Sequence, residues 1–446
     1  MSTIFALASA PGKAGVSVIR ISGPEASKAL KVLGVAPLPS PRVAVLKKIY
    51  SPVDDGLIDN ALILWMPAPN SFTGEDVAEI HVHGSRAVIA YLTEALSTTD
   101  NLRLAEPGEF ARRAFINGKM DLTEVEGLGD LIEAETKLQQ KQALRQMSGE
   151  LSALYEEWRK QLIKSLSHME AYIDFPDEDL PKEVEEELIE FVKKLKKSID
   201  KHLDDNGRGE ILRRGVYAVI LGAPNVGKSS LMNYLAKRDV AIVSNIAGTT
   251  RDVIEVNMDI AGFPVTIADT AGIRKSKNEI ENEGIKRARE KAKQADMKII
   301  IFDAETYPRF DKKTAELIDD DSILIANKSD IKKLPAKLEI EGRKVIPISV
   351  TKETGIKEFM KILEKELKER MMVGSEPNLT RAHHRKSLQE CSRSLERFLN
   401  GRKKSVDIEI SAEDLRLSAR ELGRITGRID VEDILDELFR SFCIGK

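Results

Sequence analysis

The chain has 446 residues, of which 42% are hydrophobic and 32% are charged, and this composition excludes a largely disordered protein. Its length predicts about two to four domains. The 69 lysine and arginine residues are nearly balanced by 72 aspartate and glutamate residues, so the chain as a whole lacks the positive charge of a dedicated nucleic-acid binder, although one domain could carry a local basic patch.

The sequence also bears on where the protein is found. No stretch approaches the run of about 18 apolar residues that a transmembrane helix needs, so no membrane association is expected. The apolar run from Ile4 to Ala10 has no basic segment before it, and we interpret it as a buried strand, with a degenerate signal peptide as the alternative. The two cysteines, Cys391 and Cys443, cannot build a disulfide framework. We therefore expect a cytoplasmic protein.

Residues 1–118 contain short runs of β-branched residues separated by turns rich in glycine and proline, a pattern that predicts strands. The predicted strands are Val16–Ile21, Val43–Ile49, Ala61–Trp65 and Val77–Val82. Two apolar segments, Ala26–Leu33 and Ala87–Leu96, predict helices between them. This mixture predicts a compact α+β domain.

Residues 119–210 have a helical character. Thr123 and Glu126 have the spacing of a capping box and predict a helix start. From Leu144 to Ile173, apolar residues recur every three or four positions, which predicts one long helix with Gly149 as its weak point. An acidic, proline-containing segment ends this helix, and a second amphipathic helix is expected from Val184 to about Leu203.

Strands and helices alternate through residues 211–375, which predicts a parallel α/β sheet built from βαβ units. The predicted strands are Val216–Leu221, Val265–Ala268, Lys298–Phe302, Ile323–Ala326 and Lys344–Ile348.

Residues 376–446 return to a helical pattern, with Ser411 and Asp414 as a further candidate capping box. Residues 119–210 and 376–446 are each too thin for a core of their own. We expect them to pack as one discontinuous helical domain with residues 211–375 inserted between them, because the termini of a domain usually lie close together.

A phosphate-binding loop is the strongest motif in the chain. Residues 222–229, Gly-Ala-Pro-Asn-Val-Gly-Lys-Ser, match the pattern in full, and they follow a hydrophobic strand and precede a predicted helix. The backbone amides of such a loop and the N-terminus of its helix bind phosphate. Lys228 would neutralise the β- and γ-phosphates, and the Ser229 hydroxyl would hold Mg²⁺.

Three later motifs select guanine, and their order makes the assignment specific. Asp269 and Gly272 would approach the metal and the γ-phosphate, and Asp330 in Asn327-Lys328-Ser329-Asp330 would accept hydrogen bonds from N1 and the 2-amino group of guanine, which adenine does not offer. Ser349–Thr351 follow the next strand and should line the base, and Thr250 is a candidate switch ligand of Mg²⁺. The sequence therefore predicts a Ras-like P-loop G domain that binds GTP.

The residues alone leave open which group orients the attacking water. Ile273 stands after Gly272, where many GTPases carry a glutamine that orients the attacking water. Because an apolar side chain cannot polarise water, another group must act. Glu279, Glu281 and Glu283 are candidates, and they could equally be solvated charges.

Several short motifs extend this pattern over essentially the whole chain. They are Arg20–Gly23, Ser71–Asp76, Pro107–Phe110, Asn117–Leu122 and Cys443–Lys446. With the nucleotide motifs and the interrupted helical region, they make the chain resemble the MnmE (TrmE) family of tRNA-modification GTPases.

The resemblance implies functional residues. It implies that a 5-formyl- or 5,10-methylene-tetrahydrofolate contacts Arg20, Glu79, Lys119 and Lys446, and that residues 1–118 form a folate-binding and dimerisation domain. It also implies that K⁺ lies beside the phosphates, held by Asn225, Ser244, Ile246 and Thr249, and that Glu281 orients the attacking water through a second water. The catalytic residues would then be Glu281, Lys228 and Cys443. The residues expected at GTP are Asn225, Val226, Gly227, Lys228, Ser229, Ser230, Ser244, Asn245, Ile246, Ala247, Gly248, Thr249, Thr250, Asp269, Thr270, Ala271, Gly272, Asn327, Lys328, Asp330, Ser349, Val350 and Thr351.

The family also implies partners and a reaction. A homodimer would join the FAD-dependent protein MnmG in a heterotetramer that adds an aminomethyl or carboxymethylaminomethyl group to C5 of the wobble uridine, position 34, of certain tRNAs. Two alternatives are a ribosome-assembly or signalling GTPase without folate chemistry, and a folate-dependent transferase whose GTPase activity is only regulatory. One departure from the family pattern is Val350, where the motif usually carries alanine.

Other residues have both functional and structural interpretations. Cys443 could be a reactive thiolate or could pack beside Phe442. His81 and His83 could bind a metal, but no third ligand is near them in sequence. The basic runs Lys193–Lys197, Arg112–Arg113 and Arg381–Lys386 could contact tRNA phosphates or form solvated faces.

Overall fold

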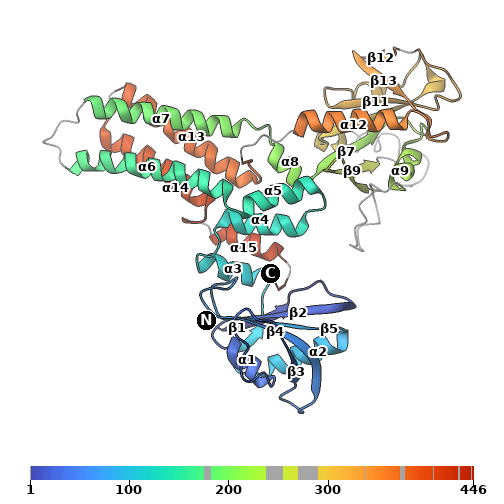
Figure 1. Ribbon diagram of the computed structural model, residues 1–446. Coiled ribbons are helices and arrows are strands. Elements are labelled where there is room, and N and C mark those ends of the chain that lie inside the picture. The colour runs from blue at the N-terminus through green and yellow to red at the C-terminus, as the bar shows by residue number, and fades with distance from the viewer. Residues whose placement is uncertain are drawn as a thin grey trace. The chain divides into compact units, whose positions relative to one another are not determined.

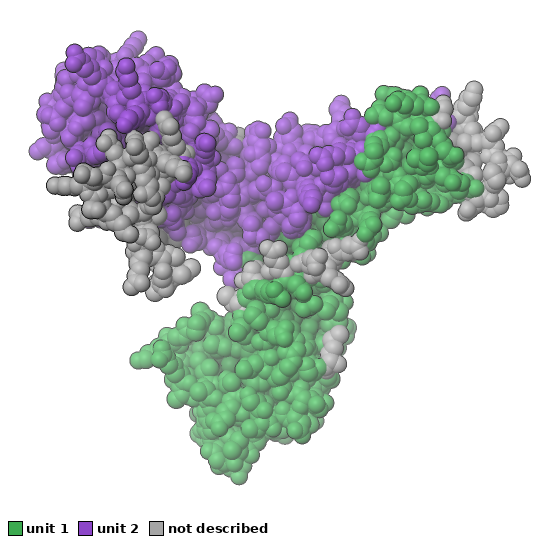
Figure 2. All heavy atoms as spheres, turned by 180° about the vertical axis from the view of Figure 1, so that it is seen from behind, with its two compact units in different colours: residues 1–129, 146–182, 397–446 green, residues 130–145, 183–396 purple. Residues whose placement is uncertain are grey.

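The computed structural model describes residues 2–174, 182–237, 255–269, 290–335, 337–371, 377–404, 406–429, 432–442 and 444–445. These residues form two compact units (Figure 2). Unit 1 comprises Met1–Gly129, Gln146–Lys182 and Arg397–Lys446, and unit 2 comprises Asp130–Arg145 and Glu183–Glu396. Among the described residues, none of the helices has the length and apolar character to cross a bilayer.

A six-stranded sheet forms the N-terminal part of unit 1 (Figure 1). Its strands, in spatial order, are β3 (Val45–Tyr50), β4 (Leu57–Met66), β5 (Val77–Gly84), β2 (Ala14–Ser22), β1 (Thr3–Leu7) and β6 (Leu102–Leu104). Neighbours are antiparallel except β1 and β6, which run parallel. Helices α1 (Ala26–Val32) and α2 (Arg86–Ser97) pack on one face through a core that includes Leu30, Leu92 and Ile63. The four predicted strands and two predicted helices are confirmed, and the run at Ile4 is the buried strand β1.

The opposite face of this sheet has an exposed apolar region at β3 and β4. Their residues alternate between the two faces. Leu46 is 67% exposed and lies opposite Leu62, while Leu64 and Met66 are half-buried. We call Leu46, Leu62, Leu64 and Met66 the apolar edge face.

Two helices begin at caps other than the predicted ones. Helix α4 (Leu122–Glu133) follows Asp121, whose Oδ1 accepts from the backbone N–H of Glu124 at 3.0 Å, while Glu124 Oε2 accepts from the N–H of Asp121 at 2.8 Å. The capping box is therefore two residues earlier than Thr123 and Glu126, which are buried within the helix.

The capping box predicted at Ser411 and Asp414 was also wrong, because the helix begins earlier in the chain. Asp407 caps helix α14 (Ile408–Ile425) by accepting from the N–H of Glu409 at 2.9 Å, so Ser411 lies inside the helix. Unit 1 also contains α3 (Glu109–Ile116), α6 (Glu150–Asp174) and α15 (Glu432–Ser441). Helices α6 and α14 lie side by side (Figure 1) and are joined by an ion pair between Arg416 and Glu170 at 2.7 Å.

The long helix predicted from Leu144 to Ile173 is two helices. Helix α5 (Lys137–Met147) ends before Gly149, and α6 begins after it. Gly149 has φ +82°, a left-handed conformation that interrupts an α-helix. The residue identified as a weak point is therefore a break.

Unit 2 contains a seven-stranded sheet whose order is β12-β13-β11-β10-β7-β9-β8. Its pairs are parallel except those of β12 with β13 and of β8 with β9, which are antiparallel. The strands are β7 (Val216–Leu221), β8 (Glu255–Ile260), β9 (Phe263–Asp269), β10 (Met297–Asp303), β11 (Ser322–Asn327), β12 (Glu339–Ile340) and β13 (Arg343–Pro347). The predicted parallel α/β architecture is confirmed.

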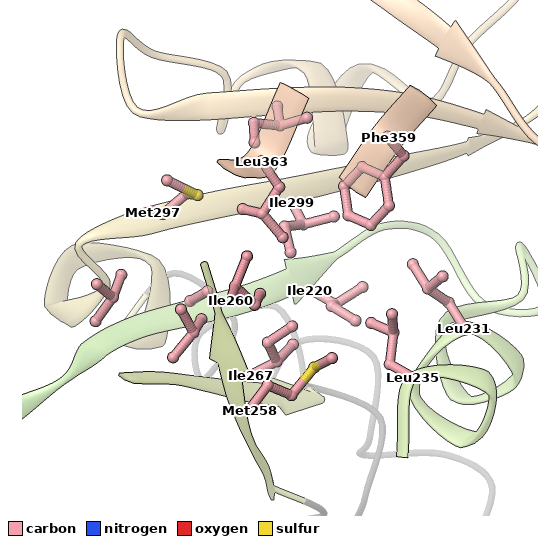
Figure 3. Packing of buried hydrophobic residues seen from close by; sticks show 14 of the residues in the cluster. Ile220, Leu231, Leu235, Met258, Ile260, Ile267, Met297, Ile299, Phe359 and Leu363 are labelled. Atoms are coloured by element: carbon pink, nitrogen blue, oxygen red, sulfur yellow. The ribbon is translucent and has the colours of Figure 1, made fainter. Parts of the chain in front are cut away.

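Helices cover this sheet through the apolar side chains of its central strands. On one face, Ile220 of β7 and Ile299 of β10 pack in the same cluster as Leu231 of α9 (Lys228–Ala236) and Phe359 of α12 (Ile356–Met371), as Figure 3 shows. Unit 2 also contains α7 (Lys182–Leu203), α8 (Arg208–Arg214), the short helix α11 (Lys312–Ala315) and α13 (Ala382–Lys403), which continues into unit 1.

The segments that enter and leave the seven-stranded sheet are held together. The guanidinium of Arg385, in α13, bonds Glu210 of α8 at 2.9 Å and Asp205 just before it at 2.5 Å. The two ends of residues 211–375 therefore lie near each other, as an insertion requires. We propose on this basis that residues 211–375 form a domain inserted between residues 119–210 and 376–446.

Candidate functional site

A tight turn joins β7 to α9 and forms the phosphate loop. Asn225 and Gly227 both have left-handed backbone conformations, with φ +63° and +102°. A Cβ on Gly227 would overlap with the side-chain amide of Asn327, so only glycine allows the two segments to approach this closely. The turn places the N-terminus of α9 at the end of a buried strand, where a phosphate can be bound.

Lys228, the first residue of α9, points back into the loop. Its Nζ donates hydrogen bonds to the carbonyl oxygens of Gly222 and Ala223, each at 2.8 Å. The residue is only 8% exposed, and burial lowers the pKa of its ammonium, while the nearby Asp269 carboxylate acts in the opposite direction. A bound phosphate would offset this burial with negative charge.

Ser229 and Asp269 meet at the ends of α9 and β9. The Ser229 hydroxyl donates to Asp269 Oδ2 at 2.9 Å, and Asp269 is 2% exposed. A hydroxyl and a carboxylate are the oxygen ligands that Mg²⁺ prefers. The pair therefore fits the predicted magnesium site.

Asn327 connects the phosphate loop to the predicted base site. Its Nδ2 donates to the carbonyl of Val226 at 2.9 Å, and its Oδ1 accepts from the N–H of Val350 at 3.2 Å. Ser349 is buried beside it, and Asp330 is exposed. The three motifs that sequence analysis placed apart therefore meet at the carboxyl ends of β7, β11 and β13.

Asp303 at the end of β10 is a neighbour of this site that sequence analysis missed. Its Oδ2 lies 2.5 Å from Nζ of Lys328. Its position in the sequence could have indicated this role, because Asp303 directly follows a predicted strand and the ends of neighbouring parallel strands lie together. In the structure that strand lies beside β11.

Many predicted site residues lie outside the described residues. They are Ser244, Asn245, Ile246, Ala247, Gly248, Thr249, Thr250, Thr270, Ala271, Gly272, Ile273, Glu279, Glu281, Glu283, Cys443 and Lys446.

Two of the predicted folate residues form a pair in the six-stranded sheet. Arg20 of β2 lies opposite Glu79 of β5, and its Nε donates to Glu79 Oε1 at 3.0 Å. The Arg20 guanidinium carbon is 5.3 Å from the ring centre of Phe72 and 5.8 Å from that of Phe110. Lys119 donates instead to the carbonyl of Pro69 at 3.1 Å.

Residues 444 and 445 lie against the same sheet. Ile444 forms an antiparallel bridge with Pro107, and a Cβ on Gly445 would overlap with the carbonyl oxygen of Leu7 in β1. Gly445 also has φ +97°, so both its backbone conformation and its surroundings require glycine.

Several residues with a second, functional interpretation have partners within the protein. His81 Nε2 is 3.3 Å from Glu79, and His83 Nδ1 is 2.8 Å from Asp59. Arg113 is paired with Glu75 at 2.9 Å. Arg385 is paired with two carboxylates as described above, and Arg381 lies 2.7 Å from Asp130. Cys391 is fully buried, as expected.

Comparisons with known proteins cover the whole chain. Residues 3–119 match the family model of the GTP-binding protein TrmE N-terminus, and residues 122–443 match that of the MnmE helical domain. The chain is 50% identical over 444 residues to the tRNA modification GTPase MnmE of Paramagnetospirillum magneticum, covering 100% of this chain and 99% of that protein. It is 49% identical over 446 residues to the tRNA modification GTPase MnmE of Parvibaculum lavamentivorans, with 100% of both chains covered. A crystal structure of Aquifex aeolicus Era bound to GDP and AlF₄⁻ matches 40% of this chain and 66% of that chain at 25% identity, with a TM-score of 0.28.

Proposed function

Since this chain belongs to the MnmE family of tRNA modification GTPases, and is therefore a GTP-hydrolysing enzyme of tRNA modification, we propose that it acts on C5 of the wobble uridine at position 34. The group added is aminomethyl or carboxymethylaminomethyl, and its bridging carbon comes from 5-formyl- or 5,10-methylene-tetrahydrofolate. The observation that carries the nucleotide half of the proposal is the meeting of three GTP-binding motifs at Asn327.

The phosphate loop and Lys228 are proposed to bind the phosphates of GTP. In the proposed mechanism, Lys228 exchanges its two carbonyl partners for phosphate oxygens, and the amides of the loop surround the β-phosphate. Ser229 and Asp269 would hold Mg²⁺, with Thr250 as a further ligand. Bound there, the metal would supply positive charge that stabilises the negative charge of the transition state.

Base recognition is the task of the loops after β11 and β13. Asp330 is proposed to accept from guanine, while Asn327 holds the phosphate loop and residues 349–351 in register. Glu281 is proposed to orient the attacking water in place of the glutamine that Ile273 replaces.

Potassium is proposed to complete the phosphate site. Asn225 is exposed in the loop, with a side-chain carbonyl that suits a monovalent cation, and Ser244, Ile246 and Thr249 would supply the remaining ligands. A cation beside the phosphates offsets charge that develops in the transition state.

Replacing K⁺ by Na⁺ at constant ionic strength should therefore lower the rate of GTP turnover by about tenfold or more. The affinity for GDP serves as the control and should stay within about twofold, because GDP lacks the γ-phosphoryl group whose charge the cation would offset in the transition state. Equal turnover in the two salts would remove the cation from the mechanism.

Folate is proposed to bind on the six-stranded sheet. Arg20 can pair with a carboxylate of the glutamate tail, and Glu79 can accept from the N–H groups of the pterin. Phe72 and Phe110 beside Arg20 add aromatic surface, and residues 444 and 445 lie against β1 of the same sheet. Lys119 and Lys446 complete the proposed site, and Cys443 is proposed as a reactive thiolate. Bound folate would supply the one-carbon unit.

Assembly is proposed to use the N-terminal sheet. The apolar edge face of β3 and β4 is exposed at Leu46 and half-buried at Leu62, Leu64 and Met66 in the single chain, and a second copy of the chain would cover it in a homodimer. We further propose a heterotetramer with the FAD-dependent protein MnmG, the binding of tRNA, and action in the cytoplasm.

The direct test is nucleoside analysis of tRNA from cells that lack this protein. The modified wobble uridines should disappear and return when the gene is restored. Calorimetry with 5-formyl-tetrahydrofolate then separates the proposal from a GTPase without folate chemistry, which would show no binding. Unchanged wobble uridines would contradict the proposed reaction.

A further inference from the structure

The turn after β10 supports the loop that is proposed to bind guanine. Asp303, the last residue of β10, lies opposite Asn327, the last residue of β11, in the parallel register. Two lysines of the loop that follows β11 bind the turn that follows β10. Lys328 Nζ lies 2.5 Å from Asp303 Oδ2, and Lys332 Nζ donates to the carbonyl oxygens of Glu305 and Tyr307 at 3.1 and 2.5 Å.

The Asp303 carboxylate is itself held in place. Its Oδ1 accepts from the N–H of Glu305 at 3.0 Å, and its side chain is 14% exposed. One carboxylate oxygen therefore caps the turn while the other binds the ammonium of Lys328. Glu305 is the other carboxylate near this ammonium among the described residues, but it lies 3.6 Å away and is 49% exposed.

The side chain of Lys328 is only partly buried. The residue has φ +63°, a left-handed conformation, and its side chain is 32% exposed. A lysine side chain in water samples many rotamers, and ordering it on binding a ligand is unfavourable. An ammonium that is already bound at its tip leaves the methylene stem ordered, and such a stem can cover an apolar surface.

We propose that Asp303 is a positioning residue for guanine nucleotides: it holds Lys328 extended, so that the lysine stem is preset against the purine that Asp330 binds. The inference rests on the proposed nucleotide site. It assigns to Asp303 no contact with the nucleotide itself. Preorganisation of this kind raises affinity by removing the ordering penalty from the binding step.

The test is a double-mutant cycle on the full-length chain, measured as the dissociation constant for GDP. Asp303→Asn keeps an oxygen that can cap the turn and removes the charge. Asp303→Asn and Lys328→Met should each weaken GDP binding about tenfold, and the double variant should bind about as well as Lys328→Met alone. Asp303→Glu should restore most of the affinity, because it keeps the carboxylate.

Two controls give the experiment its specificity. Glu305→Gln changes the neighbouring exposed carboxylate and should leave the dissociation constant within about twofold of the unaltered chain. The melting temperature without nucleotide measures any purely structural role of Asp303. The inference is wrong if Asp303→Asn binds GDP as the unaltered chain does, or if the two single effects multiply in the double variant. If the unaltered chain binds no guanine nucleotide, the proposed nucleotide site fails first and this inference fails with it.

Discussion

Replacing Lys228 by methionine is expected to lower the rate of GTP hydrolysis by about 10²- to 10³-fold, the loss that follows when one charged donor is removed from a developing negative charge. Methionine fills the space of the buried lysine stem but cannot donate to the phosphates. The substitution has two opposing effects on stability. The carbonyl oxygens of Gly222 and Ala223 lose their donor, but a buried ammonium, whose pKa burial lowers, is also removed. We therefore expect little change in melting temperature.

Lys237→Met is the matched control. Lys237 caps the other end of the same helix and is exposed, so its replacement should leave turnover within about twofold of the unaltered chain. Turnover is measured as phosphate release at saturating GTP, and nucleotide affinity is measured separately. If Lys228→Met hydrolyses GTP at the original rate, the phosphate loop described here is not the active site.

Replacing Asp330 by asparagine is expected to weaken GTP binding by about a hundredfold or more, and to allow xanthosine triphosphate to bind in its place. The carboxylate accepts two hydrogen bonds from guanine, and a carboxamide presents an N–H group where one acceptor stood, which leaves polar groups unpaired. Xanthine carries a carbonyl oxygen at C2 in place of the 2-amino group of guanine, and this oxygen can accept from the N–H of the carboxamide.

Competition with a fluorescent nucleotide measures both affinities on one sample. Glu339→Gln, an exposed acid on the edge strand β12 of the same sheet, controls for loss of negative charge and should change neither affinity. A variant at Asp330 that keeps its preference for GTP would show that another group selects the base.

The strands that the sequence predicted best are those buried on both faces. Val216–Leu221 is a continuous apolar run, and such a run has few alternatives to a central strand. Strand β8 (Glu255–Ile260) was missed although its polar residues Glu255, Asn257 and Asp259 alternate with apolar ones, which is the pattern of a half-buried strand. Such a strand at the edge of the sheet lacks the continuous apolar run of a central strand.

Helix ends were harder to predict because several residues satisfy the same local pattern. Asp121 with Glu124 and Thr123 with Glu126 both have the spacing of a capping box. What decides between them is where the backbone leaves the helix, and that depends on packing. Thr123 and Glu126 are buried, so the helix extends past them to Asp121.

Within the candidate site, too, residues that are adjacent in sequence could be predicted, whereas contacts between distant residues could not. The phosphate loop is continuous in sequence, so its residues could be named directly. The pairing of Lys328 with Asp303 joins residues that are adjacent only because β10 and β11 are neighbours in the sheet. The spacing of these residues in the sequence therefore could not predict the contact.

The approach of Gly445 to Leu7 has a consequence for synthesis of the protein. Leu7 leaves the ribosome early, whereas its neighbour Gly445 emerges only after the entire seven-stranded sheet has been translated. A nascent polypeptide that stalls before residue 444 therefore lacks the residue that packs against the carbonyl oxygen of Leu7 in β1.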